Sequence, residues 1–202
     1  MGSLKSAPKK TNHTTGELHP RNLHRTPYDF SRLIAALPDL RPFVRPHPIA
    51  GDTIDFSDPA AVLTLNRALL KLHYGIDAWD LPPGYLCPPI PSRADYIHHA
   101  ADLLSADNSA ACARPDRNAL TVLDIGTGAN CVYPLLGAAI HGWRFVASEV
   151  DPGSIAWARQ LVAANPPVSA KIEIRVQPSP QAVFQNITRP GESFALSICN
   201  PP

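Results

Sequence analysis

Helical periodicity is the first feature of the apolar and polar pattern. Between residues 58 and 75, apolar side chains recur about every 3.6 residues, which predicts a helix with one buried face. Asp58 and Pro59 suit the N-cap and the first helical position, and Gly75 suits the end of the helix. A second helix is expected over residues 93–104. The region before residue 107 is therefore predicted to be a small helical unit.

Strands and helices alternate from residue 120 onward. Short apolar runs predict strands over residues 120–124, 144–147, 172–176 and 194–199. The segments between them predict helices over residues 132–140 and 154–164 and a short helix over residues 182–187. Asn165, Pro166 and Pro167 are expected to form a loop that ends the second of these helices. This order predicts an α/β fold with a parallel sheet and right-handed crossovers.

Charge is distributed unevenly along the 202 residues, although the net charge is only +1. Residues 1–47 hold eight Lys or Arg against three Asp or Glu, a balance of +5, whereas the rest of the chain has a balance of −4. A uniformly basic nucleic-acid binder is thus disfavoured. The basic arm is typical of a phosphate-binding segment, and residues 1–17 have the composition of a disordered leader.

Neither a membrane nor a metal is indicated. No apolar run approaches the roughly 18 residues that a spanning helix needs, and the N-terminal lysines lack the apolar stretch of a signal peptide. The four cysteines have spacings that fit neither a zinc site nor a disulfide framework. We therefore expect a cytoplasmic protein with reduced cysteines and no metal.

A glycine-rich turn between a strand and a helix is the strongest sign of a ligand site. Asp124 ends the strand, and at Gly126 and Gly128 the backbone can approach a ligand beside a helix N-terminus. The dinucleotide fingerprint G-x-G-x-x-G would need glycine at Cys131, which disfavours a nicotinamide cofactor. Glu149 ends the next strand 25 residues after Asp124, near the spacing at which an acid meets ribose hydroxyls. The D-x-G-x-G pattern resembles that of class I methyltransferases, which implies a Rossmann-like fold and S-adenosylmethionine as cofactor.

Asn200, Pro201 and Pro202 directly follow the fourth expected strand. In a doubly wound sheet the first and fourth strands are neighbours at the switch point, so Asn200 is expected beside the glycine-rich turn. An exocyclic amine is a poor nucleophile, and the side-chain oxygen of Asn200 and the carbonyl of Pro201 can accept its N–H groups and orient it. The stretch resembles the (Asn/Asp)-Pro-Pro-(Phe/Tyr) motif of amino-group methyltransferases. The sequence stops before the aromatic residue and before three of that fold's seven strands, so we interpret it as truncated, either a fragment or an incomplete fold.

Three further stretches narrow the resemblance. They are residues 18–22 (LHPRN), 87–99 (CPPIPSRADYIHH) and 126–137 (GTGANCVYPLLG). Together they are similar to the family of bacterial 23S ribosomal RNA adenine-N6 methyltransferases, which includes the eukaryotic enzymes that methylate U6 small nuclear RNA. The resemblance spans residues 18–202. It implies methyl transfer to the N6 amine of an adenine in 23S ribosomal RNA, a target base that is unpaired or flipped out, and no metal.

The resemblance also implies roles for single residues. Arg93 would bind the methionine carboxylate of the cofactor, for which an arginine is suited. Glu149 would hold the ribose, and Gln181 would lie near the adenine. Tyr96 and Tyr133 are expected to be packing residues. The other assigned residues line the methionine end of the cofactor (Gly126, Gly128 and Asn130) or contact RNA phosphates (Arg21, His24 and Arg25).

The resulting division has four parts: a leader (1–17), an RNA-binding helical unit (18–107), a linker (108–119) and the first part of the methyltransferase domain (120–202). Two other functions stay open. The same Asn-Pro-Pro chemistry serves protein-glutamine N5-methyltransferases, although the basic arm and the proline-rich stretch argue against that substrate. A truncated chain could also bind cofactor or RNA without catalysis. The sequence indicates neither which adenine is modified nor an oligomeric state.

Overall fold

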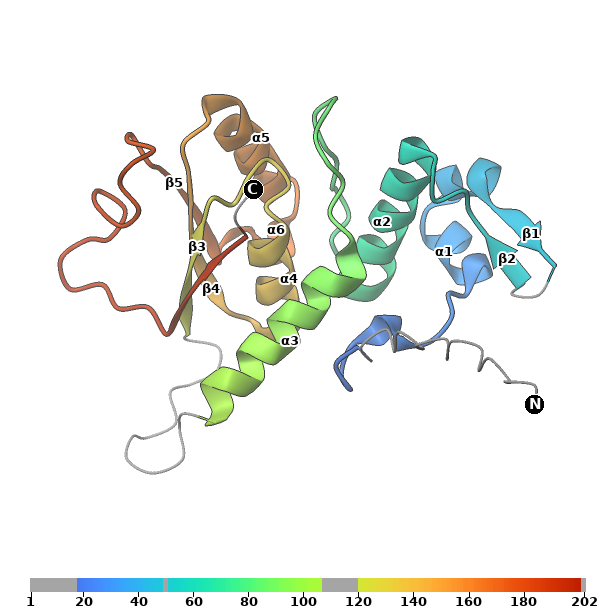
Figure 1. Ribbon diagram of the computed structural model, residues 1–202, viewed down its shortest axis with the longest axis horizontal. Coiled ribbons are helices and arrows are strands. Elements are labelled where there is room, and N and C mark those ends of the chain that lie inside the picture. Colours follow the sequence, from blue (N-terminus) through green and yellow to red (C-terminus); the bar gives the residue numbers. More distant parts are fainter. Residues whose placement is uncertain (1–17, 49–50, 107–119, 201–202) are drawn as a thin grey trace, which may run out of the picture.

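The computed structural model describes residues 18–48, 51–106 and 120–200. The expected leader, the expected linker, Pro201 and Pro202 lie outside the described residues. In the described part, an α/β body and a smaller N-terminal unit lie next to each other along the longest axis, with two long helices between them (Figure 1). No helix in the described ranges is long and apolar enough to cross a membrane.

Four parallel strands form the sheet of the α/β body, in the spatial order β5-β4-β3-β6. They are β3 (Thr121–Ile125), β4 (Arg144–Glu149), β5 (Ile172–Val176) and β6 (Leu196–Cys199). The α/β fold class is thus confirmed, and so is the pairing of the first and fourth expected strands. In the β3–β6 register, Leu123 lies opposite Ser197 and Ile125 lies opposite Cys199. The strand order therefore reverses between β3 and β6, where doubly wound sheets bind ligands.

Helices cover one face of this sheet (Figure 1). α4 (Val132–His141) follows β3, and α5 (Pro152–Ala163) follows β4. The strand residues that face these helices alternate with those on the opposite face, as the period of two requires. They join the main hydrophobic core: Val122, Phe145, Ile172 and Ile198. Instead of the loop predicted for Asn165, Pro166 and Pro167, the last two begin the short helix α6 (Pro166–Ser169), with Asn165 as its N-cap.

The opposite face is covered by the connection between β5 and β6, residues 177–195. Ile187 of this connection packs against Leu123 and Val146 of the sheet. The short helix predicted over residues 182–187 is wrong, because this stretch consists of turns and Asn186 has a left-handed φ of 66°. The side-chain amide of Gln177 donates to two carbonyls of the stretch, at 2.9 and 3.4 Å. In residues 182–187, hydrogen bonds from the Gln177 side chain thus take the place of the backbone hydrogen bonds that a helix would form.

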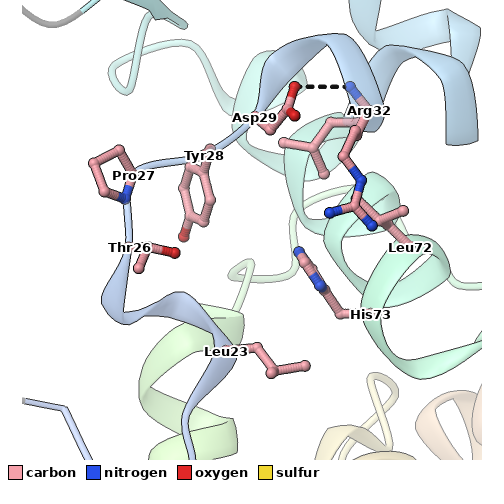
Figure 2. A pocket seen from close by; sticks show the side chains of 9 residues that line it. Leu23, Thr26, Pro27, Tyr28, Asp29, Arg32, Leu72 and His73 are labelled. Carbon is pink, nitrogen blue, oxygen red and sulfur yellow. Dashed lines mark hydrogen bonds between the residues drawn. The ribbon is translucent and has the colours of Figure 1, made fainter.

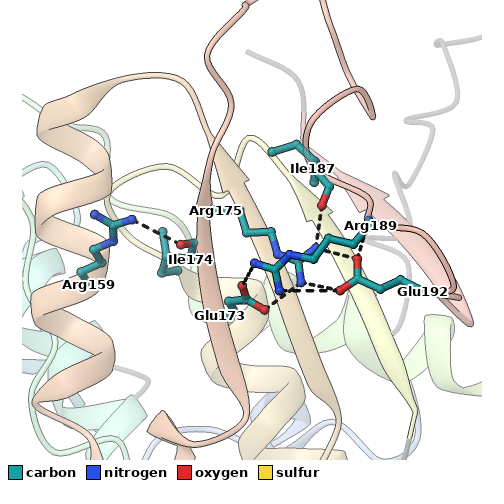
Figure 3. Close-up of polar contacts among 7 residues, drawn as sticks. All are labelled: Arg159, Glu173, Ile174, Arg175, Ile187, Arg189 and Glu192. Atoms are coloured by element: carbon teal, nitrogen blue, oxygen red, sulfur yellow. Dashed lines mark hydrogen bonds and ion pairs between the residues drawn. The ribbon is translucent and has the colours of Figure 1, made fainter.

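Arg175 of β5 fastens the same connection to the sheet (Figure 3). Its buried guanidinium donates to the carbonyl of Ile187 at 2.6 Å and to the Glu192 carboxylate at 2.6 and 2.7 Å. Glu173 accepts from Arg175 at 2.8 Å and from Arg189 at 2.7 Å. Bonds from Arg175 and from the Arg189 backbone lower the pKa of Glu192 to about 2. Charged side chains therefore fix the path of a segment without regular structure.

The N-terminal unit is helical, as predicted, and also contains a small antiparallel hairpin that the sequence pattern did not indicate. Its elements are η1 (Leu23–Arg25), α1 (Phe30–Ala36), η2 (Pro38–Phe43), β1 (Arg45–His47), β2 (Gly51–Thr53) and α2 (Pro59–Tyr74). α2 begins and ends as predicted. The Asp58 carboxylate accepts from the backbone N–H of Ala60 at 2.9 Å, and Gly75 closes the helix with a left-handed φ of 65°.

A separate hydrophobic core holds this unit together. It contains Phe30, Leu33, Leu40, Ile54, Ala61, Leu65, Ala68 and Leu69. A small cavity of about 90 Å³ lies at its surface, where the segment before α1 meets α2 (Figure 2). At its rim the Asp29 carboxylate accepts from the backbone N–H of Arg32 at 3.1 Å and caps α1.

α3 (Ile90–Ala106) is longer at both ends than the helix predicted over residues 93–104, and it packs against α4. Ile90, Ala94 and Ile97 of α3 belong to the main core of the α/β body, together with Leu70 of α2. The long helices thus join the N-terminal unit to the sheet.

Candidate functional site at the switch point of the sheet

The glycine-rich turn and Asn200 lie at the same edge of the sheet. Because Ile125 is paired with Cys199, the residues that follow them, Gly126 and Asn200, both leave the carboxyl ends of neighbouring strands. Asn200 is exposed. The structure therefore brings together two of the predicted motifs, while Pro201 and Pro202 lie outside the described residues.

Left-handed backbone conformations shape the turn. Gly126 and Gly128 have φ values of 71° and 64°, a region that glycine adopts without strain. Cys131, at the position of the third fingerprint glycine, also has a positive φ of 48° and is buried. A Cβ built on Gly126 would meet no atom within 4 Å among the described residues. The side chain of Asn130 accepts from the backbone N–H of Val132, the first residue of α4, at 3.0 Å, and Cys131 is the N-cap of that helix.

Glu149 reaches the turn from the end of β4. Its Oε2 accepts from the backbone N–H of Gly128 at 2.8 Å, and its Oε1 accepts from Val150 and Asp151 at 2.7 and 3.1 Å. Asp151 in turn caps α5 by accepting from the Ser154 backbone at 2.6 Å. The acid that ends β4 and the acid that follows it thus have different positions: Glu149 lies at the glycine-rich turn and Asp151 caps α5.

Asp124 lies beneath the turn and is buried. Burial and, to a smaller extent, the negative charge of Glu149 raise the pKa of its carboxyl to about 7, although the nearby Thr127 hydroxyl lowers it. Neither its Oδ2 nor the Thr127 hydroxyl makes a hydrogen bond of good geometry within the described part of the chain. Unpaired buried polar atoms are costly, so the pair indicates a place where a polar ligand group or water completes the bonding.

Arg93 lies on α3 beside the first turn of α4. Its Nη1 donates to the hydroxyl of Tyr133 at 3.0 Å, and the ring of Tyr96 lies 5.1 Å from that of Tyr133. Burial raises the pKa of Tyr96, and Asp124 of β3 and Cys199 of β6 make smaller contributions in the same direction. Tyr133 is buried in the main hydrophobic core, as expected of a packing residue, and its hydroxyl also accepts a hydrogen bond from Arg93. Tyr96 is 41% exposed and lies against the ring of Tyr133.

Gln181 is exposed in the connection after β5, where its side chain accepts from the Ser179 hydroxyl at 3.1 Å.

The other Asn-Pro-Pro sequence, residues 165–167, lies at the end of α5 and not at the glycine-rich turn. Asn165 is buried at the end of α5, and its side chain bonds to the backbone of Ala78 at 2.6 and 3.1 Å and to Leu161 at 2.7 Å. It is a structural residue, as its position after a helix indicates.

The residues expected to contact RNA phosphates lie away from the turn. Arg21 donates to the carboxylate of Asp102 at 2.5 Å, nine residues along α3 from Arg93, or roughly 13 Å at 1.5 Å per residue. His24 is buried against the hydroxyl of Tyr74 at 2.9 Å. Burial and two nearby histidines lower the pKa of His24 to about 4, so it is neutral at pH 7. Arg25 is exposed.

Comparisons with known proteins identify a family and relatives of this chain. A family model described as RNA methyltransferase matches residues 12–202. The ribosomal RNA large subunit methyltransferase F of Shewanella halifaxensis (strain HAW-EB4) is 52% identical over 189 residues, which are 94% of this chain and 50% of that protein. The chain thus spans about half the length of the curated relatives it matches.

Two solved structures of a human protein share the fold. The N-terminal domain of human METTL16 in complex with SAH superimposes with a TM-score of 0.77 and 33% identity, over 92% of this chain and 69% of that one. The hMettl16 catalytic domain in complex with the MAT2A 3'UTR hairpin 6 gives a TM-score of 0.75 and 33% identity, over 92% and 60% of the two chains.

Proposed function

Since the chain belongs to the RNA methyltransferase family, we propose that it transfers a methyl group from S-adenosylmethionine to the N6 amine of an adenine in 23S ribosomal RNA. The observation that carries this proposal is the β3–β6 pairing, which puts Asn200 next to the glycine-rich turn. The name of the Shewanella relative supports ribosomal RNA as substrate. The human structures, one with SAH and one with an RNA hairpin, support the cofactor and the class of partner. The proposed location is the cytoplasm, where bacteria such as Shewanella make their ribosomal RNA.

The residues at the turn fit this cofactor. The space above Gly126 leaves room for a ligand against the backbone, and the orphaned Oδ2 of Asp124 offers an acceptor to an ammonium group. Glu149 has carboxylate oxygens at the end of β4 for the ribose hydroxyls, and Arg93 supplies a guanidinium for the methionine carboxylate. Asn130 and Gly128 complete the methionine end, and Gln181 is assigned to the adenine end.

The chain's own contribution to the chemistry is orientation. The cofactor, when bound, supplies a methyl group on a positively charged sulfur. The amide oxygen of Asn200 and the carbonyl of Pro201 accept the two N–H bonds of the adenine amine, which turns its lone pair toward the methyl group. Pro202 restricts the direction of the Pro201 carbonyl. This arrangement needs neither a shifted base nor a metal.

Arg21 and Arg25 are proposed to contact RNA phosphates, which add affinity without sequence choice. The partner of Arg21 is Asp102, an exposed carboxylate that a phosphate can replace. His24 is left out of this role because it is buried and neutral at pH 7.

Methyl transfer to 23S ribosomal RNA from cells that lack the modification tests the proposal. We expect labelled N6-methyladenine, and a loss of about 100-fold or more in kcat for Asn200→Ala, because a misplaced amine costs about this much. Asn200→Asp keeps an acceptor oxygen and should retain more activity than Asn200→Ala. Both variants should bind S-adenosylhomocysteine as the wild-type protein does. Label in a protein glutamine, or full activity of Asn200→Ala, would contradict the proposal.

A further inference from the structure

The connection between α2 and α3, residues 75–89, lies against the α/β body beside α5 (Figure 1). We call it the proline-rich strap. The indole N–H of Trp79 donates to the carbonyl of Asn130 in the glycine-rich turn at 2.9 Å. Trp157 of α5 donates to the carbonyl of Asp80 at 3.0 Å. The strap is thus attached both to the turn and to the helix that follows Glu149.

A tight turn presents the outer part of the strap. The backbone N–H of Tyr85 donates to the carbonyl of Pro82 at 3.2 Å, and Gly84 between them has a φ of 85°. Proline followed by a left-handed glycine is typical of a type II turn, so Pro83 and Gly84 set this geometry locally. The turn leaves 92% of Leu86 exposed, a large apolar surface on one side chain.

Tyr85 connects this turn to the carboxylate of Glu149. Its hydroxyl lies 3.3 Å from the hydroxyl of Ser154, whose backbone N–H donates to Asp151 at 2.6 Å. The backbone N–H of Asp151 donates to Glu149 at 3.1 Å. Bonds from Ser154, and a smaller contribution from the Tyr85 hydroxyl, lower the pKa of Asp151. A chain of hydrogen bonds therefore links the strap to the acid assigned to the ribose.

Two exposed apolar side chains belong to the segments that this link joins. Val150, between Glu149 and Asp151, is 45% exposed, and Leu86 follows Tyr85 directly. Apolar surface beside a polar carboxylate suits a ligand that has a flat apolar ring next to hydroxyl groups, such as an adenosyl group.

We propose that the proline-rich strap is a wall of the cofactor site, in which Leu86 covers the adenosyl part and Tyr85 is a positioning residue that holds the strap against the segment carrying Glu149. The inference rests on the proposed function, because it names residues that bind the cofactor of that reaction. It gives Trp79, Tyr85 and Leu86 a role that neither the glycine-rich turn nor the Asn-Pro-Pro motif includes.

Tyr85→Phe removes one hydroxyl and keeps the ring. We expect the Kd for S-adenosylhomocysteine and the KM for S-adenosylmethionine to rise about 3- to 10-fold, the usual effect of one hydrogen bond, while kcat at saturating cofactor and the melting temperature stay unchanged. Leu86→Ser should raise the same two constants several-fold. Tyr28→Phe and Leu103→Ser are matched controls in the N-terminal unit and on the exposed side of α3, and neither should change cofactor binding.

Calorimetric titration of the full chain with S-adenosylhomocysteine separates the two proposals. If the wild-type chain binds and Tyr85→Phe and Leu86→Ser bind equally well, the inference about the strap is overturned while the proposed function stands. If the wild-type chain does not bind, both are overturned. A rise in the KM for RNA with an unchanged KM for S-adenosylmethionine would also overturn the inference, because it would make the strap a surface for RNA.

Discussion

Buried Asp124 makes the stability of this protein depend on pH. Burial raises the pKa of its carboxyl to about 7, whereas an unfolded aspartate releases its proton near pH 4. The folded state therefore binds this proton more tightly, and stability is lost as pH rises from about 4 to about 7. We expect the free energy of unfolding of Asp124→Asn, relative to that of the wild-type protein, to rise across this window by about 1.4 kcal/mol for each pH unit. Urea unfolding at pH 4 to 8 measures the difference.

Asp151 provides a control of opposite sign. Hydrogen bonds from Ser154 lower the pKa of this exposed helix cap, so its contribution is present above the unfolded pKa and is lost as pH falls. Asp151→Asn keeps a capping oxygen. Its stability relative to the wild-type protein should improve toward acid pH and change little above pH 5. A difference for Asp124→Asn that is constant from pH 4 to 8 would contradict the assignment of the titrating group.

Among the elements, α4 depends on a glycine for its position against the sheet. A Cβ on Gly137 would overlap the ring of Phe145, 2.6 Å from its Cε2, and would lie 3.4 Å from Cε3 of Trp143. In an exposed helix, Gly→Ala stabilises by roughly 0.5–1 kcal/mol, but overpacking a core costs about 1–3 kcal/mol. We therefore expect Gly137→Ala to lower the free energy of unfolding, measured by urea denaturation. Phe145→Leu should recover part of the loss in the double variant, and strictly additive effects would argue against this contact.

Elements whose determinants are local in sequence could be predicted. The caps Asp58 and Gly75 bound α2, and the strand-turn-helix order located Glu149 at the glycine-rich turn. The connection after β5 could not be predicted, because Arg175 and Gln177 fix its path through polar contacts. The contact of Tyr133 with Arg93 and the attachment of the strap were not predicted for a related reason: their partners are 40 to 77 residues away in the chain. Spacing along one element carries no information about such contacts.

For the whole molecule, the two hydrophobic cores are connected through α2. Leu65 and Leu69 of this helix belong to the core of the N-terminal unit, whereas Leu70 belongs to the core of the α/β body. Ile97 of α3 belongs to the core of the α/β body, and α3 packs against α4. Loss of either core therefore exposes one face of a helix that the other core needs. The units proposed from the sequence as 18–107 and 120–202 are accordingly expected to unfold together.

Leu33→Ala tests this coupling because Leu33 is buried in the N-terminal core, far along the chain from the tryptophans. Removing its side chain should cost about 2–5 kcal/mol. Trp79, Trp143 and Trp157 all lie in or against the core of the α/β body, so their fluorescence reports on that part. With one cooperative transition, the urea midpoint seen by tryptophan fluorescence falls in Leu33→Ala and agrees with that seen by far-UV circular dichroism. An unchanged fluorescence midpoint, with an earlier separate change in circular dichroism, would instead mean that the N-terminal unit unfolds on its own and that α2 and α3 do not couple the cores.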